Sequence, residues 1–299
     1  MKIPNFFIVG APKCGTTAMY TYIKKHPEIF LPELKETHFF GADHHRINHT
    51  PYTKEQYLSF FTGAKNQKRI GDASTSYLHS SIAALEIKEF NPSAKIIIML
   101  RSPVDAMYAY HHTNLYGGFE YIPDFETALN LEEKRKRGLC WPDCPGILEN
   151  LFYRDTVRYT QQVQRYFDMF SCENVHIIIF DDFKNDTAGI YKQTLCFLGV
   201  NSNFCTDFRI IRPDKSLWSV AVQNFLLSPP HIVKSFSHMI IPDNLRQTLV
   251  GSLRRLNKTN APRPPMDTEL RRRLQAEFAP EVERLSELLG RDLTHWSKD

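Results

Sequence analysis

A glycine-containing stretch near the N-terminus has the residue types and the spacing of a phosphate-binding loop. It reads GAPKCGTT from Gly10 to Thr17, and its two glycines are spaced as in the Walker A pattern G-x-x-x-x-G-K-[ST]. Thr16 occupies the position of the lysine that reaches the β- and γ-phosphates, while a lysine occurs earlier, at Lys13. We therefore expect a loop that binds phosphate but lacks the lysine with which a kinase or NTPase contacts the γ-phosphate.

The residues on either side predict that this loop joins a strand to a helix. The short apolar run FFIVG before it is typical of a buried strand, and residues 16–25 place apolar side chains at helical spacing. At such a junction the first N–H groups of the helix have no partner, and the helix dipole favours an anion. The backbone amides of residues 14–17 and the hydroxyls of Thr16 and Thr17 are therefore predicted to hold one phosphate.

Two later apolar runs predict strands that end in charged residues. AKIIIMLRSP ends at the cation Arg101, and VHIIIFDDF ends at Asp181 and Asp182. The acidic pair could hold Mg²⁺ as a Walker B aspartate does, but acidic residues after a strand are also common helix N-caps. A cation at a strand end favours a ligand whose charge is neutralised by the protein rather than by a metal.

These strands alternate with helical stretches, for example residues 82–90 and 154–170. Continuously apolar strands are typical of a parallel sheet that is covered on both faces. The alternation predicts an α/β fold of the P-loop type with three layers, in which a central parallel sheet is flanked by helices. We expect one domain over residues 1–299.

Two insertions and a helical C-terminus complete the predicted organisation. Residues 40–68 are polar and aromatic, and residues 117–146 are mixed and charged, so both are expected to be insertions. Near the C-terminus, Asp267 is predicted to cap a helix, Pro280 to start a second helix and Gly290 to end it.

Composition excludes several classes of partner. The net charge of +4 suits a local anion site and is too small to indicate nucleic-acid binding. No run approaches about 18 apolar residues and no secretory signal is visible, so we expect a cytoplasmic protein without a membrane span. Cys140 and Cys144 could form a short-loop disulfide, but reduced thiols are favoured in a long chain without a secretory signal.

Three blocks in order resemble one enzyme family. FFIVGAPKCGTTAMYTYIKKHPEI, LPELKETHFF and IIIMLRSPVDAMYAYHH resemble the PAPS-dependent sulfotransferases, in particular their carbohydrate and bacterial branch. The C-terminal PPMDTELRRRLQAEFAPEVERLSELLGRDLTHW is similar to bacterial members, so the resemblance runs over residues 6–296. It implies in-line transfer of a sulfuryl group from phosphoadenosine phosphosulfate (PAPS) to a hydroxyl or amine of a glycan or small metabolite, with no metal required.

The resemblance also implies the residues of the donor site. Lys13 would lie beside the bridging oxygen and offset the charge that develops there. Arg101 would bind the 3′-phosphate, with Ser102 or Lys215 in support. The family's RNPxxRAYSxY is RSPVDAMYAYH here, so its arginine and its 3′-phosphate-binding serine are replaced by Ala106 and Ala109. The residues that would hold the 5′-phosphate are Lys13, Cys14, Gly15, Thr16, Thr17 and Ala18.

The block KETHFF is the expected acceptor side. By resemblance to the glycan sulfotransferases, Glu36 would be the base that removes the acceptor proton, His38 would support it, and Lys35 would lie near the sulfuryl oxygens. In GDASTSYLH, Asp72 and Ser74 would line the acceptor cleft. His111 and His112 are either alternative bases or residues that only cap or flank the helix after Pro103.

Three other interpretations stay open. The histidine-rich run HFFGADHHRINH could hold a metal through His38, His44, His45 and His49, although polar histidine-rich loops are common. The chain could be a P-loop kinase or NTPase that uses ATP and Mg²⁺. It could also be a non-catalytic nucleotide-binding protein on this fold, as the alanine at position 109 allows.

Overall fold

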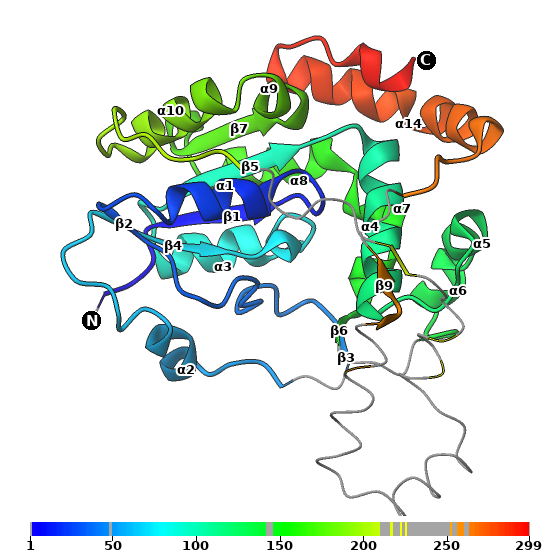
Figure 1. Ribbon diagram of the computed structural model, residues 1–299, viewed down its shortest axis with the longest axis horizontal. Coiled ribbons are helices and arrows are strands. Elements are labelled where there is room, and N and C mark those ends of the chain that lie inside the picture. The colour runs from blue at the N-terminus through cyan, green and yellow to red at the C-terminus, as the bar shows by residue number, and fades with distance from the viewer. Residues whose placement is uncertain are drawn as a thin grey trace, which may run out of the picture.

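A five-stranded parallel sheet forms the centre of the molecule (Figure 1). The computed structural model describes residues 2–47, 50–141, 146–209, 216–217, 222, 225, 252, 256–259 and 263–298. The sheet has the order β2-β4-β1-β5-β7. Its strands are β1 Phe6–Gly10, β2 Ile29–Phe30, β4 Arg69–Ala73, β5 Lys95–Leu100 and β7 Val175–Ile179.

Helices cover both faces of this sheet. The chain moves from β1 toward β2 and, later, in the opposite direction from β4 toward β5, so right-handed crossovers place the intervening helices on opposite faces. One face carries α1 (Thr16–Ile23) packed with α10 (Thr187–Leu198), and the other carries α3 (Ala83–Phe90) packed with α8 (Tyr159–Met169). The predicted α/β fold with a helix-flanked parallel sheet is confirmed.

The two central strands are buried along their whole apolar length. All five residues of β1 are buried, and so are Ile96 to Leu100 of β5. Close contact between β1 and β4 requires a glycine, because a Cβ on Gly71 would lie 2.1 Å from the ring of Phe6. The apolar core therefore fixes the register of the strands whose ends carry the candidate site.

The two predicted insertions meet through a short antiparallel pair. Strand β3 (Arg46–Ile47) pairs with β6 (Gly146–Ile147), with Arg46 opposite Ile147. The second insertion is fixed internally by a fully buried ion pair, in which Arg135 Nη2 lies 2.7 Å from Glu120 Oε1. The other α-helices and strands of the described ranges are α2 Lys54–Ser59, α4 Pro103–Gly117, α5 Phe125–Asn130, α6 Glu132–Lys136, α7 Tyr153–Thr156, α9 Phe180–Asn185, β8 Ser216–Leu217, β9 Lys258–Thr259 and α14 Thr268–Leu289.

The C-terminal helix α14 differs in one respect from the prediction. Asp267 caps it as expected, since its Oδ1 accepts the Leu270 N–H at 2.9 Å, and Gly290 ends it with φ of 62°. The helix does not restart at Pro280 but continues through it. Burial of Phe278 and Val282 on either side of the proline continues the helical apolar face, and this outweighs the lost backbone hydrogen bond.

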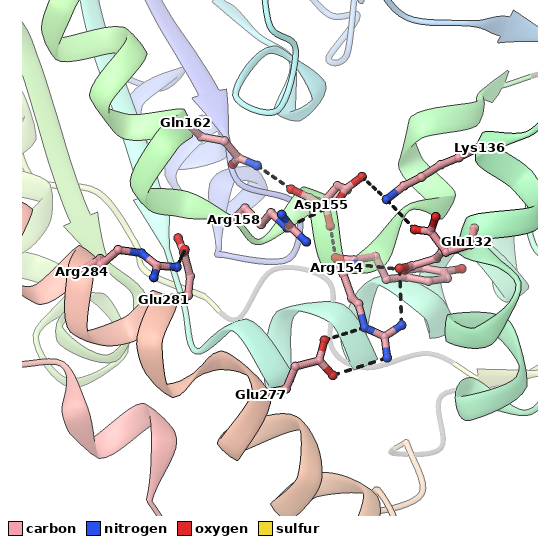
Figure 2. A network of polar contacts seen from close by, with 12 residues as sticks. Glu132, Lys136, Arg154, Asp155, Arg158, Gln162, Glu277, Glu281 and Arg284 are labelled. Carbon is pink, nitrogen blue, oxygen red and sulfur yellow. Dashed lines mark hydrogen bonds and ion pairs between the residues drawn. The ribbon is translucent and has the colours of Figure 1, made fainter.

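Helix α14 is fastened to several other elements by charged side chains. Arg154 on α7 bonds Glu277 of α14 at 2.7 Å and also contacts the buried Glu132 of α6 at 3.5 Å (Figure 2). Glu281 accepts the backbone N–H of Thr160 on α8 at 2.7 Å.

Among the described residues, no helix combines the length and the apolar character needed to cross a membrane.

Candidate functional site

The loop that the sequence predicts to bind phosphate, Gly10 to Thr17, lies as expected between the end of β1 and the start of α1. Gly15 is the N-cap of α1 with φ of 87°, and the helix start has no side-chain cap. A side chain at this position would meet the rings of Phe180 and Phe183 at 3.1–3.3 Å, so the turn requires glycine. The open helix N-terminus, with Thr17 partly exposed beside it, has the character of an anion site.

The other residues of the loop contribute unequally. Lys13 is partly exposed with φ of 64°, while Thr16 is almost fully buried. The Cys14 N–H is bonded to Ala11 O at 3.4 Å, and the Ala18 N–H is bonded within the turn to Gly15 O at 3.0 Å. The backbone amides of Gly15, Thr16 and Thr17 are therefore donors that the loop can offer to a ligand.

Cys14 is a packing residue in this loop. Its side chain is buried, with Sγ 3.9 Å from the hydroxyl of Tyr159. Burial raises the pKa of the thiol to about 12, although the charges of Arg101 and Lys13 act in the opposite direction. The thiol is therefore protonated at neutral pH and is no nucleophile, and both cations lie close enough to the loop to act on it.

Glu36 is held as an ionised carboxylate beside the sheet edge. Its Oε1 accepts from Lys35, and its Oε2 accepts the Thr75 N–H at 2.7 Å and the Thr75 hydroxyl at 3.2 Å. Burial acts to raise the pKa of Glu36, but the charge of Lys35, the nearby His38 and the hydrogen bonds outweigh it and hold that pKa below its ordinary value. The side chain retains 30% exposure, so it is accessible from outside the protein.

His38 lies beside Glu36 as a neutral imidazole. Burial lowers its pKa to about 4, against the attraction of Glu36. Its Nδ1 lies 2.8 Å from Ser76 Oγ, and its backbone N–H donates to Ser74 Oγ at 3.1 Å. Above a pH of about 4 the ring of His38 is neutral, so it can orient a substrate or Glu36 without neutralising the carboxylate.

Asp72 and Ser74 line the interior beneath Glu36. Asp72 is fully buried and accepts from three hydroxyls, those of Tyr77 at 2.8 Å, Thr37 at 2.9 Å and Tyr57 at 3.1 Å. Burial raises the pKa of Asp72 to about 6 despite these bonds. Both residues support the chain that carries Glu36 and His38, and their contact with an acceptor stays a prediction.

Arg101 follows the end of β5 at the same edge of the sheet. Its guanidinium lies 4.8 Å over the ring of Phe180, and its Nη2 lies 3.6 Å from Asp105 Oδ2. Ser102 next to it is the N-cap of α4, yet its side chain makes no capping bond. Ala109 is buried on α4 and offers no hydroxyl, and Lys215 lies outside the described residues.

Parallel strands bring these groups together. Because β4, β1 and β5 are neighbours in one parallel sheet, their carboxyl ends meet at one edge, where Thr75, the phosphate-binding loop and Arg101 follow them. Glu36 is tied to the same edge through its N–H, which donates to Ala73 O at 2.8 Å. Ligands of open α/β sheets bind outside the carboxyl ends of the strands.

Two residues that the sequence did not indicate also belong to this region. Thr75 binds the Glu36 carboxylate, and its only signal was the hydroxyl-rich run STSY after a strand. Tyr110 lies on α4, and burial together with the negative charge of Glu36 raises the pKa of its phenol. Nothing in the sequence separated Tyr110 from the other aromatic residues of that helix.

The histidines divide between different roles. His111 is buried and bonds Ile122 O at 2.9 Å, which fixes the chain after α4. The rings of His44 and His79 are tilted by 37° to each other with centroids 4.9 Å apart, and His45 bonds Glu149 at 2.6 Å. Within the described ranges, no group of three or more His, Cys, Asp or Glu side chains is arranged to hold a metal ion. His49 and Cys144 lie outside those ranges.

The acidic pair after β7 faces the C-terminal segment. Asp182 forms a two-point ion pair with Arg291, and Asp181 accepts the indole N–H of Trp296 at 2.8 Å. Both aspartates lie in the first turn of α9 and neither is its N-cap, which is Ile179. These contacts give the two aspartates a packing role in place of the N-cap role that their sequence position suggested.

A known protein family matches most of this chain. Residues 4–215 match the model of the sulfotransferase domain. The chain is 26% identical over 309 residues to the bifunctional heparan sulfate N-deacetylase/N-sulfotransferase 4 of Mus musculus, covering 98% of this chain and 31% of that protein. Carbohydrate sulfotransferase 15 of Homo sapiens is 30% identical over 148 residues, covering 36% of this chain and 26% of that protein.

A solved structure is similar over its full length. The crystal structure of a sulfotransferase from Alicyclobacillus acidocaldarius superposes with a TM-score of 0.75 at 28% identity and covers 100% of both chains. By contrast, the chain spans about a third of the length of the mouse relative and about a quarter of the human one.

Proposed function

Because the chain belongs to the sulfotransferase domain family, we propose that it moves a sulfuryl group from PAPS to a hydroxyl or amine of an acceptor. The acceptor that we propose is a glycan or a small metabolite, since the relatives include enzymes named for heparan sulfate and for carbohydrate. The observation that carries the proposal is the meeting of an open helix N-terminus, Arg101 and an ionised Glu36 at one edge of the sheet.

In this proposal the donor binds to the loop and to the end of β5. The amides of Gly15, Thr16 and Thr17 and the Thr17 hydroxyl bind the 5′-phosphate. Arg101 binds the 3′-phosphate, because a guanidinium matches two phosphate oxygens, and the hydroxyl of Ser102, which makes no capping bond, can add a donor. Lys13 stabilises charge on the bridging oxygen as the sulfur–oxygen bond breaks.

The acceptor side supplies the base. A Glu36 oxygen takes the proton from the acceptor hydroxyl or amine while that acceptor atom forms its bond to sulfur. The bond between sulfur and the bridging oxygen breaks, and phosphoadenosine phosphate leaves with the electron pair. Lys35, bonded to Glu36 and only 13% exposed, lies where it can also offset charge on the sulfuryl oxygens. Since Lys13, Lys35 and Arg101 supply the positive charge, the proposed transfer requires no metal.

The decisive experiment is turnover of the Glu36→Gln variant. We expect kcat to fall about 10²- to 10⁴-fold, because the amide cannot accept the acceptor proton. Labelled PAPS with a panel of glycan and small-metabolite acceptors gives the rate, and calorimetry gives the affinity for phosphoadenosine phosphate, which should be unchanged.

Glu33→Gln is the matched control. Glu33 lies in the same loop with a side chain that is 96% exposed, so its variant should turn over at the wild-type rate. Wild-type turnover by Glu36→Gln would refute Glu36 as the base. Donor binding without turnover of any acceptor by the wild type would favour the non-catalytic alternative.

A further inference from the structure

Two arginines from distant parts of the chain share the carboxylate of Asp105. Arg271 on α14 bonds Asp105 Oδ1 through Nη2 at 3.0 Å, although 166 residues separate them. Arg101 Nη2 lies 3.6 Å from the other oxygen, Oδ2. A separation of 3.6 Å is too long for a hydrogen bond, so Asp105 is committed to Arg271 rather than to Arg101.

The guanidinium of Arg101 is accordingly positioned by its neighbours and stays available to a ligand. It lies over the ring of Phe180 and retains 21% exposure, and in the part of the chain that the structure describes it makes no hydrogen bond. Asp105 follows it by four residues, close enough for a two-point ion pair if its carboxylate turned toward Arg101. Such a pair would occupy the two parallel N–H groups that a phosphate needs.

The position of Arg271 is unusual for a cation. It lies in the first turns of α14, where the positive end of the helix dipole disfavours positive charge. Asp267 fixes the start of this helix, and the Tyr108 hydroxyl on α4 donates to Pro264 O at 3.1 Å just before it. These contacts hold Arg271 against α4, so that its charge is directed at Asp105.

We propose that Arg271 is a positioning residue of the donor site. By holding Oδ1 of Asp105, it prevents this carboxylate from closing on Arg101 and leaves the Arg101 guanidinium available for the 3′-phosphate of the donor. The three groups together carry one net positive charge, whereas Arg101 and Asp105 alone would be neutral. Arg271 thereby assists phosphate binding at a site where Ala109 supplies no hydroxyl. This inference rests on the proposed function.

The test is a double-mutant cycle, read by calorimetry with phosphoadenosine phosphate. We expect Arg271→Gln to weaken binding about tenfold, within the range that coupled neighbours show. Asp105→Asn should bind as well as the wild type, and Asp105→Asn combined with Arg271→Gln should restore affinity to within about threefold of the wild type. Arg271→Lys keeps a cation near Asp105 and should lose less than Arg271→Gln.

Arg273→Gln is the control, because Arg273 lies on the same helix and pairs with Glu126 while 52% exposed. Its affinity for phosphoadenosine phosphate should equal that of the wild type. Unchanged affinity in Arg271→Gln, or no rescue by Asp105→Asn, would overturn the positioning role. Thermal unfolding of each variant separates lost folding from lost binding, and the lysine variant tests the idea if the glutamine variant does not fold. Failure of the wild type to bind phosphoadenosine phosphate would instead refute the proposed function.

Discussion

At the scale of single residues, Glu36 shows how neighbours prepare a carboxylate for proton transfer. Lys35 and Thr75 bind different oxygens of Glu36, so the group is oriented as well as charged. Its lowered pKa makes it a weaker base, but it stays ionised throughout the neutral range. His38 beside it has a pKa of about 4 and is neutral there, so it does not compete as an acid.

A prediction at this scale concerns pH dependence in Lys35→Met. The charge of Lys35 helps to lower the pKa of Glu36, and burial acts to raise it. Without Lys35 that pKa should rise, so Glu36 becomes protonated at higher pH and the acid limb of kcat/KM should move to higher pH. The measurement is a pH profile of kcat/KM with saturating donor.

The matched control is Lys24→Met, since Lys24 pairs with the exposed Glu33 and not with Glu36. Its profile should coincide with that of the wild type. An acid limb that does not move in Lys35→Met would show that Glu36 is not the group that titrates.

At the scale of elements, α14 contacts several of the helices around the site. It contacts α4 through Arg271, α5 through Arg273 and α7 through Glu277, and Figure 2 shows how the last of these contacts continues to α6. Its buried apolar face provides the main stabilisation, since exposed ion pairs contribute little. The charged contacts instead determine how the helix is oriented on its neighbours.

Glu132 in this network provides a stability prediction. Burial raises the pKa of Glu132 from 4.5 to about 7, and the negative charge of Asp155 acts in the same direction. The backbone N–H and the charge of Arg154, and the charge of Lys136, act to lower that pKa but do not outweigh burial. Between these two pH values the folded protein binds a proton that the unfolded chain does not, so this group makes the free energy of unfolding fall as pH rises. In Glu132→Gln the free energy of unfolding should decrease between pH 5 and 8 by about 1 to 3 kcal/mol less than it does in the wild type.

Urea unfolding at several pH values measures this effect. The control is Glu133→Gln, because Glu133 is the next residue on α6 and its side chain is 71% exposed. Its pH dependence should match the wild type, and a Glu132→Gln variant with the same dependence would contradict the assignment.

At the scale of the whole molecule, the sheet order decides which loops can form one site. The strands β4, β1 and β5 are adjacent, and the segments that follow them carry Thr75, the phosphate-binding loop and Arg101. The strand β7 is next in order, but Asp181 and Asp182 after it are bonded to Trp296 and Arg291. This arrangement favours a phosphate ligand neutralised by arginine and lysine over a nucleotide that depends on Mg²⁺.

Ligand-dependent melting tests that preference. Phosphoadenosine phosphate at about 100 times its Kd should add about 2.7 kcal/mol of stability and raise Tm by a few degrees, with EDTA present. ATP with Mg²⁺ at the same concentration should raise Tm less, because Thr16 replaces the lysine that would hold the γ-phosphate. A larger shift with ATP and Mg²⁺ would favour the kinase or NTPase alternative.

The sequence by itself determined the strands β1, β5 and β7 of the five-stranded sheet, the loop between β1 and α1, and the charged residues that follow β5 and β7. These features depend on short-range patterns, such as the continuous apolar runs of β1 and β5 and the glycine that a left-handed turn requires at Gly15. The helix start at Asp267 was predictable for the same reason, since a cap bonds within one turn. Local spacing is sufficient wherever the partners are neighbours along the chain.

Only the tertiary structure decided which partners the charged groups have and which of them are buried. Asp72 and Glu36 are both carboxylates in polar stretches, yet Asp72 is buried among three hydroxyls and the Glu36 side chain keeps 30% exposure. Helix α14 continues through Pro280 because its buried face packs on other helices, which its own sequence cannot show. The contact of Arg271 with Asp105 crosses 166 residues. Burial and long-range pairing depend on how distant segments pack, and they set the charge state of each group at the site.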